Sequence, residues 1–316
     1  LPVGQRSAYY ALLPELSGDA HAGSIFTLGN AAWLGYRSAN LAVDGLYHAG
    51  RGGAGTVFAR FASALVLQGR PLELAEFFAG DDSAFARRPD AELAPLLKVH
   101  CARLSGPVGG TIAKLPATGA AQDGRNTLPA WNARRLGYPL ADLGSPPVLR
   151  ATRQGHTGCH WCQVDCRHWH SVPADYAPGG RDLLLDDFEP AYAIFAMLGL
   201  GEGIPAGDLR ARLDLRAEVD RRLILPIEQM GCDVMDIGLG LAALLEGVSR
   251  GLVPAADVPP CLRQVGGDPL EAAVEAVELL RSGGAAPFAA LRAVGDGPEA
   301  LAERYPALRD MVFSCG

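Results

Sequence analysis

The spacing of hydrophobic and polar residues changes along the chain. In the second half, apolar side chains recur every three or four residues between charged ones, a period typical of amphipathic helices. Asp268 before Pro269 is a helix-start signal, and Gly283 is a helix-end signal. This half is therefore predicted to be mainly α-helical. The clearest helices are expected over residues 209–223, 235–248, 270–280 and 298–304.

The first part, to about Gly69, is rich in glycine and alanine and contains only short apolar runs. Residues 24–28 suit a buried strand that ends at a turn at Gly29. Residues 57–67 suit a mostly buried helix or a long strand. A short helix is expected over 71–78 and a loop-rich connection over 107–147. The chain is thus predicted to divide into a mixed α/β part over 1–70 and a helical region over 71–316.

Charge and hydropathy exclude two classes of partner. The sequence has 28 Lys+Arg and 35 Asp+Glu, a formal net charge of −7, whereas a dedicated nucleic-acid binder usually carries a basic excess. No apolar run approaches the roughly 18 residues that suggest a membrane span. The start has no signal-peptide pattern, so a cytoplasmic protein is expected. Because the chain begins at Leu1 and ends directly after an apolar stretch, we expect it to be a fragment.

Three of the seven cysteines lie close together, as Cys159, Cys162 and Cys166. An odd number of cysteines with one dense cluster is typical of a metal site in a reducing compartment. Thiolates are soft ligands, which suits an iron–sulfur cluster or zinc. Zinc would need a fourth ligand, and His168 or His170 could supply it. The spacing alone does not choose between the two metals.

A second candidate is the glycine-rich turn at residues 50–55. Its backbone N–H groups and the Arg51 guanidinium could approach a phosphate closely, because the glycines carry no Cβ. The turn has neither the dinucleotide-binding spacing nor the ending of a P-loop. A purely structural tight turn is therefore the alternative.

Taken in order, these features resemble the tungsten-containing aldehyde:ferredoxin oxidoreductase family. The resemblance runs from about Gly29 to about Tyr305. It consists of an A-G-R-G-G-x-G turn at 49–55, the C-x2-C-x3-C run at 159–166, and a D-x-x-G-L-D motif matched by residues 228–233. It implies a mainly α fold in which helical domains follow the end of a mixed α/β N-terminal pterin-binding domain.

The resemblance also implies cofactors and the residues that hold them. The cofactors are a [4Fe–4S] cluster, a tungsten or molybdenum bis-pyranopterin, and magnesium. Cys159, Cys162 and Cys166 would ligate the cluster. Arg51 and the glycine amides would neutralise pterin phosphate, and Asp233 would accept from pterin N–H groups. The full set of implied pterin contacts is His48, Gly50, Arg51, Gly52, Gly53, Glu228, Cys232 and Asp233.

The implied activity is the oxidation of an aldehyde to a carboxylic acid, with electrons passing through the cluster to ferredoxin or a similar acceptor. Glu189 lies nearest to the family's active-site glutamate and is the candidate catalytic residue. The family's E-x-x-H metal motif would fall on Arg222 and Leu225. Neither side chain ligates a metal, so any homo-oligomer is expected to form without a metal-bridged contact.

The sequence departs from the family at Tyr47, where the family has arginine, and at Glu228 and Cys232 within the pterin motif. Most of the family's N-terminal domain and its fourth cluster cysteine have no counterpart here. Two alternatives therefore stay open. One is a non-catalytic iron–sulfur relative or electron-transfer subunit. The other is a zinc-stabilised helical binding module.

Overall fold

The computed structural model describes residues 4–15, 23–69, 153–157, 167–172, 183–185, 194, 198, 200, 204–205, 208–263 and 268–312. Its first part is a four-stranded antiparallel sheet in the order β3-β2-β1-β4. The strands are β1 (Gly23–Leu28), β2 (Leu41–Val43), β3 (Tyr47–Ala49) and β4 (Ala64–Gln68). Three helices accompany them: α1 (Gln5–Leu12), α2 (Asn30–Trp33) and α3 (Ala54–Phe58).

Helix α1 covers one face of this sheet. Thr27 lies in the middle of β1, is fully buried, and its Oγ1 donates to the backbone carbonyl of Gln5 in α1 over 3.1 Å. Ala42 and Ala64 are its register partners on the two neighbouring strands. Since partners across a ladder share a face, small residues line the face that receives the helix.

A second, three-stranded antiparallel sheet follows, in the order β5-β6-β7. It contains β5 (Arg153–Thr157), β6 (Arg167–Val172) and β7 (Leu183–Leu185). Thr157 at the end of β5 pairs with Arg167 at the start of β6. The sequence stretch that carries the three clustered cysteines begins and ends at this pair, and lies itself outside the described residues.

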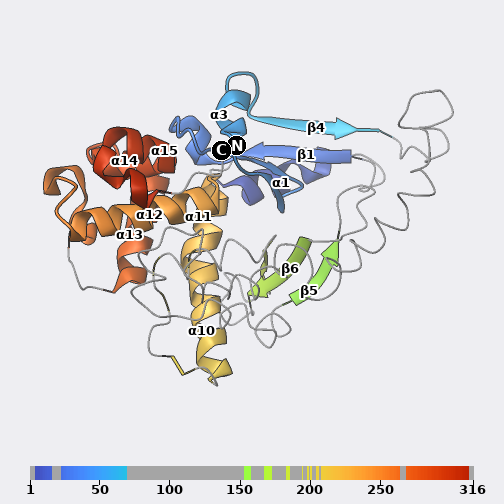
Figure 1. Cartoon of the computed structure of the whole chain (residues 1–316). Helices are drawn as coiled ribbons and strands as arrows, with labels where there is room; N and C mark the ends of the chain where they lie inside the picture. The colour runs from blue at the N-terminus through green and yellow to red at the C-terminus, as the bar shows by residue number, and fades with distance from the viewer. Residues whose placement is uncertain are drawn as a thin grey trace, which may run out of the picture.

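The second part is helical (Figure 1). Helix α10 (Leu209–Val219) continues through a π-helical turn, η4 (Asp220–Ile224), into α11 (Leu225–Met230). Pro226 has no N–H to donate, and at this point the backbone N–H of Leu225 reaches back five residues to Asp220, so the helix widens instead of ending. The remaining helices are α12 (Val234–Ser249), α13 (Pro269–Ser282), α14 (Ala289–Gly295) and α15 (Pro298–Arg304).

Four short 3₁₀ turns complete the described elements: η1 (Leu13–Glu15), η5 (Ala255–Asp257), η6 (Pro260–Leu262) and η7 (Pro306–Met311). No helix within the described ranges is long and apolar enough to cross a bilayer.

The helical interpretation of the second half is confirmed. The side chain of Asp268 accepts from the N–H of Leu270 over 2.8 Å and caps α13, which ends at Gly283 with a φ of +80°. Capping of this kind satisfies backbone groups that a helix end leaves without intrahelical partners. The fold is therefore mainly α with a mixed α/β part, as expected.

The prediction for residues 57–67 was wrong. Helix α3 ends at Phe58, the chain turns, and β4 begins at Ala64, so the segment is neither one helix nor one strand. Phe61 in the turn is 82% exposed, and Leu65 on β4 is also exposed. An apolar run with exposed members cannot be told from a buried one by composition alone. Likewise, the turn expected after Gly29 is the start of α2. The segments expected over 71–78 and 107–147 lie outside the described residues.

One hydrophobic core connects the two parts. Leu28 at the end of β1, Ala31 in α2, and Tyr36 and Ala39 after it belong to the same buried cluster as the apolar faces of α11 to α15. Segment 28–41 is thus packed into the helical part, although it is far from it in sequence. This packing fixes the position of the glycine-rich turn that follows.

Candidate functional site

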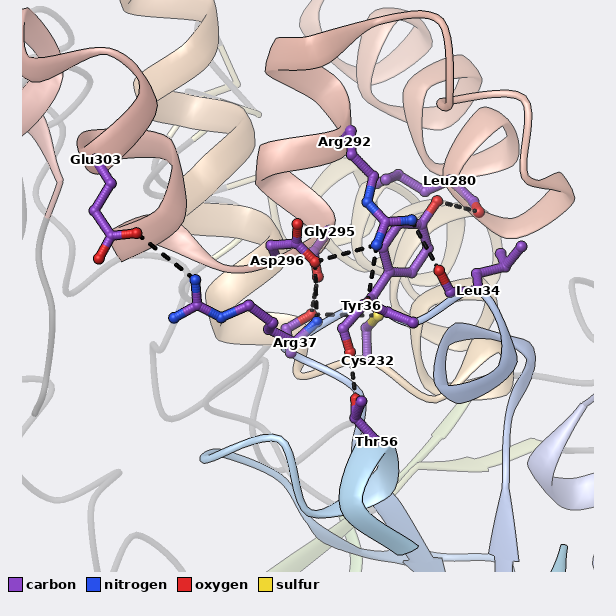
Figure 2. Close-up of polar contacts among 12 residues, drawn as sticks. Leu34, Tyr36, Arg37, Thr56, Cys232, Leu280, Arg292, Gly295, Asp296 and Glu303 are labelled. Atoms are coloured by element: carbon purple, nitrogen blue, oxygen red, sulfur yellow. Dashed lines mark hydrogen bonds and ion pairs between the residues drawn. The ribbon is translucent and has the colours of Figure 1, made fainter. Parts of the chain in front are cut away.

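Residues 36–40 form the link between the sheet and the helices. Tyr36 is fully buried, and its Oη donates to the carbonyl of Leu280 over 3.0 Å. Figure 2 shows Arg292 lying over the ring of Tyr36, with its Cζ 4.4 Å from the centroid, a cation–π arrangement. Ser38 Oγ donates to the carbonyl of Gly295 over 2.6 Å. The link is therefore bonded to α13 and α14.

The same link holds the glycine-rich turn. The N–H of Gly55 donates to the carbonyl of Ala39 over 3.0 Å, and Thr56 Oγ1 donates to the carbonyl of Tyr36 over 2.6 Å. Gly53 has a φ of +69°, and a Cβ there would collide with the carbonyl oxygen of Arg37. Only glycine adopts this conformation at such close approach without strain. The turn is thus held rigidly at its C-terminal end.

On its other side, the link holds the connection between α11 and α12. Ala39 forms a β-bridge with Cys232, and the N–H of Asn40 donates to the carbonyl of Gly231 over 2.7 Å. Gly231 has a φ of +81°, and a Cβ there would lie 2.9 Å from the Cα of Gly29. The glycine of the D-x-x-G-L-D-like motif is therefore needed for a backbone crossing.

These contacts bring two of the sequence motifs together. A Cβ on Gly50 would lie 2.8 Å from Oδ2 of Asp233, so the start of the glycine-rich turn lies directly against this carboxylate. Arg51 Nε lies 3.9 Å from Oδ1 of Asp233 and 3.9 Å from Oδ1 of Asp236. Asp233 also caps α12, since its Oδ1 accepts from the N–H of Asp236 over 2.8 Å. Gly52, with a φ of +88°, has open space where a Cβ would point.

The site is a partly buried cluster of charges. The side chain of Arg51 is 39% exposed, and those of Asp233 and Asp236 are 14% and 20% exposed. Burial, together with the negative charge of Asp233, raises the pKa of Asp236 to about 6, against the opposing effect of Arg51. A carboxyl group of this kind changes its charge near neutral pH, which is typical of functional sites.

The other predicted pterin contacts have different surroundings. Glu228 is 6% exposed, and its Oε2 accepts from Arg6 of α1 over 3.3 Å. Cys232 is fully buried, its Sγ lies 3.4 Å from Ser38 Oγ, and burial raises the pKa of its thiol to about 12. His48 is half-buried on β3, opposite Ala42. Among the predicted pterin residues, Gly50 and Arg51 of the turn lie against Asp233 at the start of α12.

The predicted metal ligands Cys159, Cys162 and Cys166 and the predicted catalytic residue Glu189 lie outside the described residues. Within the described ranges, no group of three or more His, Cys, Asp or Glu side chains is placed to hold a metal ion.

Arg222, which stands where the family has the first residue of its metal motif, has a structural role. Its guanidinium binds both carboxylate oxygens of Glu271 in α13, over 2.6 and 2.7 Å, and Glu218 over 3.0 Å. Leu225, at the other motif position, is buried. An intrachain ion pair therefore occupies this position.

Sequence reasoning missed Asp236 and the polar residues that hold the link. Asn40 receives a hydrogen bond from Gln5 over 2.8 Å and donates to the carbonyl of Cys232 over 2.9 Å. No local pattern predicts such a pair. Asp236 had a weak signal: an acidic residue three positions after an aspartate is typical of a helix start. Here the backbone N–H of Asp233 donates to the carbonyl of Ser38, so the carboxylate of Asp236 faces Arg51 instead.

Comparisons with known proteins show a fold likeness. Neither a protein-family model nor a curated protein matches the chain. Among solved structures, it is similar to a chain of the active-site complex BamBC of benzoyl-coenzyme A reductase, in complex with 1,5-dienoyl-CoA. The TM-score is 0.57 and the sequence identity 15%, over 98% of this chain and 43% of that chain. The chain thus spans less than half the length of that protein. At this identity the likeness shows the fold alone, and the resemblance to the tungsten-containing family stays a prediction.

Proposed function

We propose that the chain is the cofactor-binding part of an oxidoreductase resembling the tungstopterin aldehyde:ferredoxin oxidoreductases. The observation that carries the proposal is the meeting of Gly50 and Arg51 with Asp233 at the start of α12. These residues come from two motifs that lie far apart in the sequence. The fold likeness to a reductase supports the proposal at the level of architecture.

The turn and Asp233 offer groups that match the phosphate and the ring of a pterin. The guanidinium of Arg51 would bind its phosphate, and the N–H groups of a turn with positive φ at Gly52 and Gly53 would assist. The carboxylate of Asp233, which lies against the turn, would accept from ring N–H donors. When bound, a tungsten or molybdenum pterin supplies a centre that accepts two electrons from a substrate.

Two further roles belong to the proposal on the strength of the family resemblance. Cys159, Cys162 and Cys166 would hold a [4Fe–4S] cluster that passes single electrons to ferredoxin or a similar acceptor. The pairing of Thr157 with Arg167 brings together the two ends of the stretch that carries them. Glu189 would exchange a proton with a small aldehyde substrate.

A coenzyme A thioester is the second candidate substrate. The fold likeness to a chain of a benzoyl-coenzyme A reductase complex favours it. In that case the reaction would be a reduction of the thioester substrate, and electrons would pass from the cofactors to the substrate.

The test is the metal and pterin content of the anaerobically purified protein, measured by mass spectrometry and by fluorescence after oxidative release. Iron together with tungsten or molybdenum, and released pterin, is the expected result. It would be followed by assays of aldehydes with a viologen acceptor and of thioesters with a reduced viologen donor. Iron alone would favour an electron-transfer relative. Zinc without iron or pterin would contradict the proposal.

A further inference from the structure

Asp236 is a second carboxylate on Arg51 that the family motif does not include. Its Oδ1 lies as far from Arg51 Nε as that of Asp233, 3.9 Å in both cases. Asp233 is already engaged as the cap of α12, because it accepts from the N–H of Asp236. Asp236 instead lies in the first turn of α12, and its carboxylate faces the guanidinium of the glycine-rich turn.

The charges that act on Asp236 come from three elements. Asp233 stands at the start of its own helix, Arg51 belongs to the glycine-rich turn, and Glu299 belongs to α15. Arg51 thus has two carboxylates at 3.9 Å, and Glu299 adds a further negative charge that acts on Asp236. An anionic ligand that approaches Arg51 meets this negative excess, and the repulsion is reduced when one carboxyl group is protonated.

We propose that Asp236 couples ligand binding at the glycine-rich turn to proton uptake, because its ionised carboxylate competes with an anionic ligand for Arg51. This inference rests on the proposed function, since the ligand is the phosphate-bearing cofactor assigned to the turn. When Asp236 is protonated, its neutral carboxyl group competes less for Arg51, and the guanidinium interacts more strongly with the ligand. When Asp236 is ionised, Arg51 is shared between the ligand and α12.

The direction of the pH effect follows from burial. The pKa of Asp236 is raised to about 6, so the carboxyl group is largely protonated at pH 5 and ionised at pH 8. Ligand affinity is therefore expected to fall as the pH rises through about 6. If the bound anion raises the pKa of Asp236 by about one further unit, affinity falls on the order of 10-fold across that range.

The experiment measures how fast pterin leaves the anaerobically purified protein at about pH 5 and about pH 8. Wild-type protein should lose it on the order of 10-fold faster at the higher pH. Asp236→Asn should lose it at the slow rate at both pH values, because its side chain cannot ionise. Asp310→Asn, which removes an exposed carboxylate of η7, should keep the wild-type pH dependence. An Asp236→Asn protein that also keeps it would overturn the proposal.

If no pterin accompanies the protein, the proposed function fails, and a second probe then decides the role of Asp236. Sulfate keeps its charge throughout this pH range. The protein is therefore titrated with sulfate, and the NMR signals of the backbone amides of Gly52 and Gly53 report on binding at the turn itself. Tighter sulfate binding at the lower pH, lost in Asp236→Asn and in Arg51→Ala, would support the coupling. Sulfate binding that is independent of pH in wild-type protein, or no binding at all, would refute it.

Discussion

Arg292 and Arg51 both join the segments around the first sheet to the helices, and their side chains are almost equally exposed, at 35% and 39%. Arg292 donates to the carbonyls of Leu34 and Gly35 over 2.8 and 2.9 Å and lies over the ring of Tyr36 (Figure 2). Arg51 has carboxylates at 3.9 Å, next to glycines. Contact geometry, and not exposure, distinguishes an arginine that holds the fold from one suited to a ligand.

The largest effect is expected where the backbone of Gly29 meets the backbone of Met230 and Gly231. A Cβ on Gly29 would overlap the main-chain carbonyl of Met230, so Gly29→Ala requires the crossing to move apart. We expect a loss of at least about 3 kcal/mol in the free energy of unfolding, measured by urea titration. Gly69→Ala is the matched control, since nothing lies within 4 Å of a Cβ there. Equal stability of the two variants would show that the crossing is not tightly packed.

Arg292→Ala should destabilise the fold and spare the site. It removes two charge-assisted hydrogen bonds to carbonyls and the cation–π contact, so a loss of about 2 kcal/mol is expected by urea titration. Pterin retention in the folded fraction should stay at the wild-type level. A variant that keeps its stability and loses the pterin would reverse the roles assigned to the two arginines.

Arg51→Ala should give the opposite result. The free energy of unfolding is expected to change by no more than about 0.5 kcal/mol, because the guanidinium is partly exposed and its ion pairs with Asp233 and Asp236 are long. Pterin dissociation should be faster by on the order of 10-fold, the effect of one lost charge-assisted hydrogen bond. Unchanged dissociation would mean that the guanidinium does not bind the cofactor.

The smallest expected effect is the pH-dependent change in the free energy of unfolding that the ionisation of Asp236 causes. Because the folded state holds the proton of Asp236 more tightly than the unfolded chain does, its ionisation lowers stability as the pH rises from about 4 to about 6. Asp236→Asn removes this penalty, so it should be more stable than wild type above pH 6, by on the order of 1 kcal/mol given partial exposure, and should match it near pH 4. Melting temperatures across this range are the measurement. A difference that does not change with pH would exclude a raised pKa.

The sequence predicted local features well and tertiary contacts poorly. The caps at Asp268 and Gly283 and the period of the helices depend on neighbouring residues, so they could be recognised directly. The split of 57–67 into α3 and β4 could not, because β4 exists through pairing with β1, far away in the sequence. The same holds for the π-helical turn before Pro226, which composition does not reveal.

The candidate site, too, could be predicted from the sequence only in part. The glycine-rich turn and Asp233 were selected by their motifs, but the motifs do not state that Gly50 lies against Asp233. That contact depends on Asn40, whose hydrogen bonds to α1 and to the connection between α11 and α12 have no sequence pattern. Asp236 was missed because a carboxylate in the first turn of a helix usually interacts with the helix terminus.

The central claim is that the glycine-rich turn and the start of α12 form one binding site. Its most direct test is an experimental structure of the anaerobically purified protein that shows the space between them. We expect a phosphate-bearing ligand that contacts Arg51 and the amides of Gly52 and Gly53, with Asp233 accepting from the same ligand. A structure of pterin-containing protein in which the pterin lies elsewhere, with Arg51 bound only to Asp233 and Asp236, would contradict it.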